Sequence, residues 1–184
     1  MNTTTRSGLL AVTLTLASCA NTIEREFEID APIDSSWAVI GEDFGGVEKW
    51  ASVIPSSYAT VQDGVPTERV CESNIGSLKE TVLEYDAEAH RVAYIAEVDD
   101  APFFVSQLAN SWTLTDNGRG GTTVRMEFDA DLWPVFNVVM WPLMRGEFAT
   151  LFDETVEELQ YYVENGTPHP RKLEAIREAE ESSS

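Results

Sequence analysis

The residue types that most often do chemistry in proteins are scarce in this chain. It has two histidines and two cysteines, the common transition-metal ligands, among 184 residues. His90 lies between two alternating segments and His169 between two prolines, so both are expected at the surface and no histidine-based dyad is predicted. The Gly-x-Ser-x-Gly, His-Glu-x-x-His and dinucleotide-binding signatures are missing. The sequence therefore predicts no metal site, no cofactor and no complete active site.

Carboxylates are abundant, but their spacing indicates a solvated surface. There are 32 Asp and Glu against 12 Lys and Arg, which gives a net charge of −20. Such a field repels phosphate backbones, so no nucleic-acid partner is expected. Asp153, Glu154, Glu157 and Glu158 fall on one side of a single predicted helix. Because that face lacks the loop carbonyls that calcium needs, the four side chains are expected to face solvent.

The first eighteen residues have the pattern of a signal peptide. Arg6 precedes an uncharged, mostly apolar run over residues 8–18, about half the length of a membrane-spanning helix. The run ends in Leu16-Ala-Ser-Cys19, which resembles the lipobox of bacterial lipoproteins, in which the cysteine is lipidated and becomes the first residue. We expect residues 1–18 to be removed and Cys19 to be lipidated, with simple cleavage or a buried N-terminal helix as the alternatives.

This interpretation places the protein in the bacterial cell envelope, either lipid-anchored or secreted to the periplasm. Membrane contact is then expected only through the anchor at Cys19, which three residues separate from the first strand-like segment. Cys71 would be the only remaining thiol. It lies in an alternating segment and is expected to be a small buried hydrophobic residue.

The rest of the chain begins with an α+β pattern without internal repeats or linkers. Residues 23–30 alternate apolar and acidic side chains, as in a half-buried strand. Pro32 then opens a short amphipathic helix that ends at Gly41, and a second short helix is expected over residues 44–50. From residue 52 to residue 132 the period is two, with short polar turns, which predicts an antiparallel meander.

The C-terminal third is predicted to be helical. Apolar residues from Met144 to Tyr162 recur with helical spacing, which predicts a helix of about 20 residues ending at Asn165-Gly166. It is expected to lie across the concave face of the sheet. The apolar residues 133–142 before it are interpreted as a lid, a membrane-contact patch or a segment packed on the sheet rim. Residues 167–184 are expected to form a charged, flexible tail, frayed or weakly helical.

This order of strand, two short helices, meander and long helix resembles the START/Bet v 1-like (SRPBCC) superfamily, and within it the polyketide cyclase/dehydrase-like proteins. The resemblance covers residues 22–166, and its carriers are residues 27–37, Trp50, Arg69, residues 80–94, residues 112–114, residues 123–126 and the long helix. It implies an α+β helix-grip fold over residues 19–166, with a curved antiparallel sheet wrapped around the C-terminal helix. It also implies a hydrophobic cavity for lipids, polyketides, steroids or plant-hormone-like molecules.

Within this resemblance, Glu80 is the acid that matches the family pattern, on a strand expected to face the cavity. It is expected either to act there as an acid or hydrogen-bond anchor, or to face solvent. Arg69 is its expected counter-charge on the adjacent strand, with a weak surface pair as the alternative. The other expected ligand contacts are Tyr94, Ser106, Leu108, Asn110, Trp112, Met126, Phe128, Phe148 and Phe152.

Three functions remain open on the sequence. Binding or carriage of a hydrophobic small molecule between the sheet and the C-terminal helix is favoured, because no nucleophile, metal site or acid–base pair is visible. The second is a cofactor-independent cyclase or dehydratase that acts on a polyketide-like substrate through a buried Glu80 or Tyr94. The third is a structural or interaction protein whose core is filled by its own Trp and Phe side chains.

Overall fold

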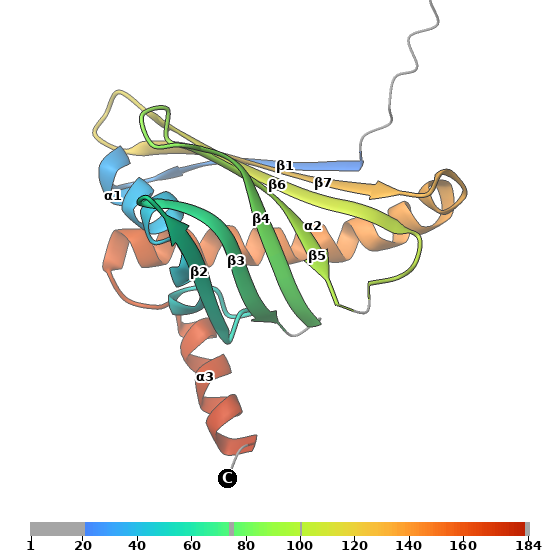
Figure 1. Cartoon of the computed structure of the whole chain (residues 1–184). Helices are drawn as coiled ribbons and strands as arrows, with labels where there is room; N and C mark the ends of the chain where they lie inside the picture. The colour runs from blue at the N-terminus through green and yellow to red at the C-terminus, as the bar shows by residue number, and fades with distance from the viewer. Residues whose placement is uncertain (1–20, 74–75, 100, 183–184) are drawn as a thin grey trace, which may run out of the picture.

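Seven antiparallel strands form one curved sheet in the computed structural model, which describes residues 21–73, 76–99 and 101–182 (Figure 1). The strand order is β1-β7-β6-β5-β4-β3-β2, so that β2 to β7 form a meander and β1 closes the sheet against β7. This confirms the predicted sheet. The strands are β1 (Asn21–Ile29), β2 (Ser56–Gln62), β3 (Val65–Ser73), β4 (Gly76–Asp86), β5 (Arg91–Val98), β6 (Val105–Asp116) and β7 (Thr122–Leu132).

Alternation along each strand decides which side chains enter the core. On β7, Val124, Met126 and Phe128 are buried, whereas Arg125 and Asp129 point to solvent. The same period of two places one face of each strand on the concave side of the sheet. The inner face is therefore continuous across strands that lie far apart in the sequence.

The connection between β1 and β2 contains the two predicted short helices. α1 (Ile33–Trp37) follows Pro32 and continues into a π-helical turn, η1 (Ala38–Glu42), in which the Asp43 amide donates to the Ala38 carbonyl at 3.0 Å. A 3₁₀ helix, η2 (Phe44–Lys49), comes next. Both segments bury large apolar residues, and they cover one end of the sheet (Figure 1).

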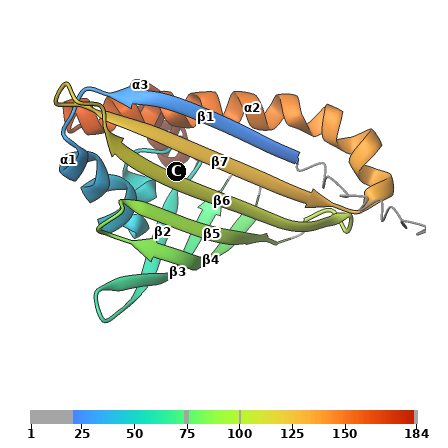
Figure 2. The same cartoon turned by 90° about the horizontal axis from the view of Figure 1, so that it is seen from above.

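The long helix α2 (Pro134–Asn165) has 32 residues and begins ten residues earlier than predicted. Pro134 occupies its first turn, where the missing N–H costs nothing. Pro142 is accommodated inside the helix, and α2 bends near its start (Figure 2). Its C-terminus is the predicted one, because Gly166 adopts a left-handed φ of 67° and donates its N–H to the Tyr162 carbonyl at 2.9 Å.

Residues after the long helix form α3 (Pro170–Ser182), so the helical alternative for the tail is confirmed and the frayed one is wrong. Lys172 in its first turn is 3% exposed and donates to the Ile54 carbonyl at 2.8 Å. Glu158 of α2 is also buried, contrary to the prediction of a fully solvated acidic face. It accepts hydrogen bonds from the Ser52 amide at 2.7 Å and from Arg171 of α3 at 2.9 Å. These partners make the burial of a carboxylate possible.

Candidate functional site

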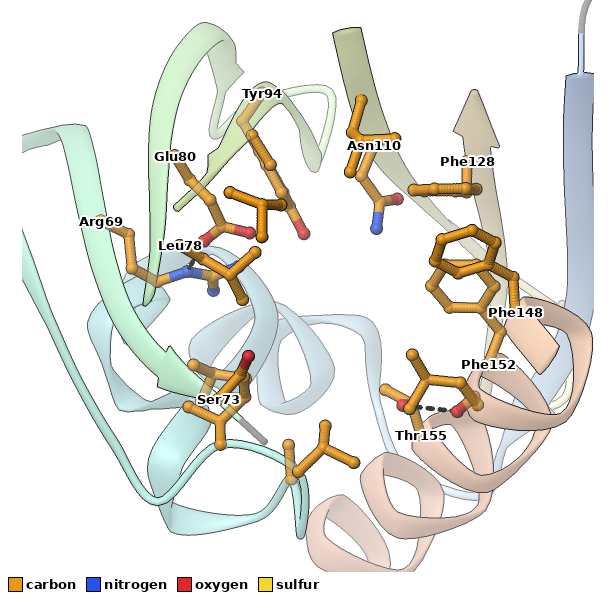
Figure 3. Close-up of a pocket in the computed structure, with 18 of the residues that line it drawn as sticks. Arg69, Ser73, Leu78, Glu80, Tyr94, Asn110, Phe128, Phe148, Phe152 and Thr155 are labelled. Carbon is orange, nitrogen blue, oxygen red and sulfur yellow. Dashed lines mark hydrogen bonds and ion pairs between the residues drawn. The ribbon is translucent and has the colours of Figure 1, made fainter. Parts of the chain in front are cut away.

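A cavity of about 350 Å³ lies between the concave face of the sheet and α2 (Figure 3). One end is closed by Val39 and Ile40 of η1, by η2 and by residues 50–54. The rest of the wall comes from the concave side of the sheet, mostly from alternate strand residues, and from one side of α2. The sheet supplies Arg69, Ser73, Leu78, Glu80, Tyr94, Ala96, Val98, Val105, Leu108, Ala109, Asn110, Trp112 and Phe128, and α2 supplies Met144, Phe148, Leu151, Phe152, Thr155 and Leu159.

Aromatic side chains form the α2 side of the cavity. Phe148 and Phe152 are one helical turn apart, and both contact Phe128 of β7, with ring centroids 5.1 Å and 4.7 Å away. The Thr155 hydroxyl, also on this wall, donates to the Leu151 carbonyl of its own helix at 2.8 Å. This wall is therefore almost wholly apolar and offers a surface for hydrocarbon.

A buried ion pair lies on the sheet side of the cavity. Arg69 of β3 and Glu80 of β4 are directly opposed in the strand register, and each side chain is 9% exposed. The Arg69 Nε donates to Glu80, and its Nη1 donates to the Phe44 carbonyl at 2.8 Å. The guanidinium also lies 4.0 Å from the Phe44 ring centroid and 5.1 Å from that of Tyr94. The predicted partnership is confirmed, and the alternative of an exposed surface pair is wrong.

The groups around this pair are held in their protonated forms. Burial of Arg69 opposes its charge, but the field and hydrogen bond of Glu80 raise the pKa of the guanidinium. Burial, with the nearby Glu80 carboxylate, raises the pKa of Cys71 to about 12 and that of Tyr94 to about 12. Both stay neutral at physiological pH. Cys71, 2% exposed, is the buried hydrophobic residue expected from the sequence.

Two further polar groups, the Asn110 amide and the Tyr94 hydroxyl, lie on the cavity wall. Asn110 lies between Tyr94 and Phe128 on neighbouring strands, and its Oδ1 is buried without a hydrogen-bond partner among the described residues. The Tyr94 hydroxyl accepts a bond from Trp112 Nε1 at 3.3 Å, which leaves its own proton free to be donated. Figure 3 shows both groups directed into the same space. A buried acceptor without a partner costs about 1–3 kcal/mol, and a ligand could recover this.

Nine of the eleven predicted contact residues line the cavity, and Ser106 and Met126 do not. A bulge between Val105 and Gln107 shifts the register of β6, so that Ser106 is exposed. Met126 is fully buried opposite Trp112 and packs within the core, outside the cavity wall. Whether the other nine contact a ligand stays a prediction.

The lining residues that sequence reasoning missed include two instructive groups. Ala96 and Val98 have the same parity on β5 as Tyr94, so extending the alternation from Tyr94 would have found them. Val53 and Ile54 reach the cavity through the chain path after η2, which no periodicity specifies. Their position depends on Glu158 and Lys172, which hold this segment to α2 and α3.

The described part of the chain carries neither a metal-binding cluster nor a membrane-spanning helix. There, no three His, Cys, Asp or Glu side chains are placed to hold a metal ion. No helix in the described ranges is long and apolar enough to cross a bilayer. The predicted signal peptide and Cys19 lie outside the described residues.

Comparison with known proteins gives a consistent match. A family model described as polyketide cyclase / dehydrase and lipid transport matches residues 20–164. No curated protein matches the chain significantly. A START superfamily protein from Mycobacterium smegmatis has a similar structure, with a TM-score of 0.65 and 16% identity, over 79% of this chain and 99% of that one. The protein XoxI from Bacillus cereus gives a TM-score of 0.62 and 18% identity, over 78% and 96%. At these identities the structural likeness concerns the fold.

Proposed function

Because the chain belongs to the polyketide cyclase/dehydrase and lipid transport family, and so to the START-like proteins that its sequence pattern resembles, we propose that it binds or carries one hydrophobic small molecule of lipid or polyketide type. The observation that carries this proposal is the cavity of about 350 Å³ between the sheet and α2. Its wall is mostly aliphatic and aromatic, with a few polar groups at fixed positions. Small-molecule sites commonly combine these features.

The ligand should be neutral and carry a polar group such as a hydroxyl. The charge of Arg69 is already balanced by Glu80, so the site does not call for a charged ligand. Asn110 Oδ1 can accept a hydrogen bond from the ligand, and the Tyr94 hydroxyl can donate one to it. The hydrocarbon part of the ligand would pack against the apolar wall of the cavity at Phe128, Phe148 and Phe152.

The site supports binding better than catalysis. Glu80, the candidate acid, is held by Arg69, and Tyr94 and Cys71 are both neutral at physiological pH. None of these groups is therefore arranged as a free base or an activated nucleophile. The cavity also argues against a core filled by its own aromatic side chains.

A titration with the uncharged probe 1-aminoanthracene tests the proposal. Ala96 of β5 faces the cavity beside Glu80, so Ala96→Phe should fill part of the site and weaken probe binding by at least about tenfold. Ala93 lies on the opposite face of the same strand and is absent from the cavity wall, so Ala93→Phe is the matched control and should leave the affinity unchanged. Equal affinities for both variants, or no binding by the wild type, would refute the proposal.

A second titration tests the polar anchor. Naphthalene and 2-naphthol differ by one hydroxyl, and the wild type should prefer 2-naphthol. Asn110→Leu removes the acceptor, and the preference should fall by about tenfold, the equivalent of one hydrogen bond. An unchanged preference would remove Asn110 from the recognition of the ligand.

We also propose that residues 1–18 are cleaved and that Cys19 carries a lipid in the bacterial cell envelope. The support is the apolar run that ends in Leu16-Ala-Ser-Cys19. Cys19→Ser should move the protein from the membrane fraction to a soluble or uncleaved form. Recovery of the wild type as a soluble, unlipidated chain would contradict lipidation.

A further inference from the structure

The described surface carries a cluster of large exposed apolar side chains at the start of α2. We call Phe103, Trp133, Val135, Val138, Val139 and Leu143 the apolar patch, and each is between 51% and 78% exposed. Residues 132–144 contain no charged side chain, although 24% of the whole chain is charged. A contiguous exposed surface of this kind in an acidic protein marks an interaction site.

The patch is a single surface made from two segments. Val135, Val138, Val139 and Leu143 have the i, i+3, i+4 and i+8 spacing of one helix face. Phe103, from the connection between β5 and β6, packs edge-on against Trp133, with ring centroids 5.8 Å apart. It also contacts Phe136 of α2 at 5.3 Å. These contacts fix the loop residue beside the helix face.

This surface adjoins one end of the cavity. Pro102, next to Phe103, and Met144, next to Leu143, both belong to the cavity wall. The first strand, β1, also begins at this end of the domain (Figure 2). Asn21 is the first residue of β1 and pairs with Ala130, three residues before Trp133, and its side chain donates to the Ala130 carbonyl at 2.8 Å. Figure 2 shows the beginnings of β1 and α2 at the same end of the molecule.

We propose that the apolar patch inserts into the headgroup boundary of an electrically neutral lipid bilayer. The apolar run 8–18 and Cys19 precede Asn21 in the sequence, Cys19 by two residues, and two residues of extended chain span at most about 7 Å. A bilayer that holds either element therefore lies next to this surface. The exposed Trp133 has the amphipathic ring that favours the membrane interface. The net charge of −20 opposes anionic lipids, so apolar insertion into zwitterionic lipid supplies the attraction.

This inference goes beyond the proposed ligand binding, because it assigns a membrane contact to the folded domain itself. It requires neither a lipid on Cys19 nor an occupied cavity. It does place the cavity wall at Pro102 and Met144 toward the membrane, where a hydrophobic ligand could pass between the bilayer and the protein without crossing water.

Tryptophan quenching in the full chain tests the insertion directly. Trp133 is 51% exposed, the other four tryptophans are buried or half-buried, and residues 1–20 contain none. Vesicles of phosphatidylcholine with brominated acyl chains should therefore quench Trp133 fluorescence, and Trp133→Phe should lose this quenching. Added phosphatidylglycerol should weaken the effect. Because quenching requires the ring to reach the acyl chains, attachment through the leader alone does not produce it.

A charge placed in the patch separates insertion from other contacts. Val138→Asp should lower the vesicle affinity measured by quenching about tenfold, because a carboxylate is costly in the boundary. Leu83→Asp is the control, since Leu83 of β4 is 65% exposed and lies outside the patch. Both variants should keep the wild-type affinity for 1-aminoanthracene, so that a failure of this inference is distinct from a failure of ligand binding.

Three results would overturn the inference. They are an unquenched Trp133 in vesicle-bound protein, equal quenching in Val138→Asp and Leu83→Asp, and a dimer that Val138→Asp converts to a monomer. The last result would identify the patch as an interface between two copies of the chain.

Discussion

Removing one partner of the Arg69–Glu80 pair should destabilise the protein more than removing both. Each side chain is 9% exposed, so neither charge can be solvated by bulk water once it is alone. Glu80→Leu leaves the guanidinium with the Phe44 carbonyl and two aromatic rings as its partners. It should lower the free energy of unfolding by about 3–5 kcal/mol. Arg69→Met should cost a similar amount, because it strands the carboxylate beside Cys71.

The double variant Arg69→Met/Glu80→Leu replaces the pair with apolar side chains of comparable length. It should be more stable than either single variant, with a coupling free energy of at least about 2 kcal/mol. Urea unfolding curves give the free energy of unfolding of all four proteins without adding ions. The matched control is the exposed pair Lys79–Glu68 on the same two strands, with Nζ and Oε2 2.9 Å apart. Its coupling should be near zero and should fall further in salt.

Two results would refute a coupled, buried ion pair: single variants that unfold at the wild-type urea midpoint, or single-variant losses of stability that simply add in the double variant. Either result would mean that water or a neighbouring group replaces the missing partner. A coupling as small as that of the control pair would likewise contradict the burial of Arg69 and Glu80.

Three further predictions concern the elements around the cavity. Leu159→Ala, at a fully buried position of α2, should cost about 2–5 kcal/mol in urea unfolding, while Glu157→Ala on the exposed side should leave the midpoint almost unchanged; equal effects would mean that the helix faces are misassigned. Tyr94 has a pKa raised to about 12 in the folded state, so the unfolded chain loses this proton first as the pH rises. The free energy of unfolding should therefore fall by up to about 3 kcal/mol between pH 10 and 12. An equal fall in a Tyr94→Phe variant would exclude Tyr94 as the cause. Lys172→Met should release the Ile54 carbonyl and weaken 1-aminoanthracene binding as well as stability; unchanged binding would show that α3 does not hold the cavity wall.

The sheet and its inner face could be predicted because a period of two is a local property of the sequence. Arg69 and Glu80 alternate inward on adjacent strands, and the structure places them directly opposite each other. The prediction failed at Ser106 because a bulge reverses the parity of the residues before it. A single inserted residue of this kind leaves no periodic signal.

The helical part shows the same division between local and long-range information. The end of α2 follows from Gly166 and its left-handed conformation, which a local pattern can reveal. Its start was missed because the apolar residues 133–142 were interpreted as a separate segment before the helix, whereas the helix begins at Pro134 and tolerates Pro142. The burial of Glu158 and Lys172 depends on contacts among three separate segments, α2, α3 and residues 52–54, so their charged side chains suggested solvent exposure until the tertiary contacts were known.

Native mass spectrometry of the protein purified from its own host tests ligand binding most directly. We predict a discrete added mass on each chain, from one hydrophobic molecule that fits the cavity of about 350 Å³, and its release on denaturation. Ala96→Phe prepared in the same way should lose the added mass, and Ala93→Phe should keep it. A wild-type chain without any bound molecule, together with no uptake of added lipid or 1-aminoanthracene, would contradict the account, as would an added mass that Ala96→Phe retains in full.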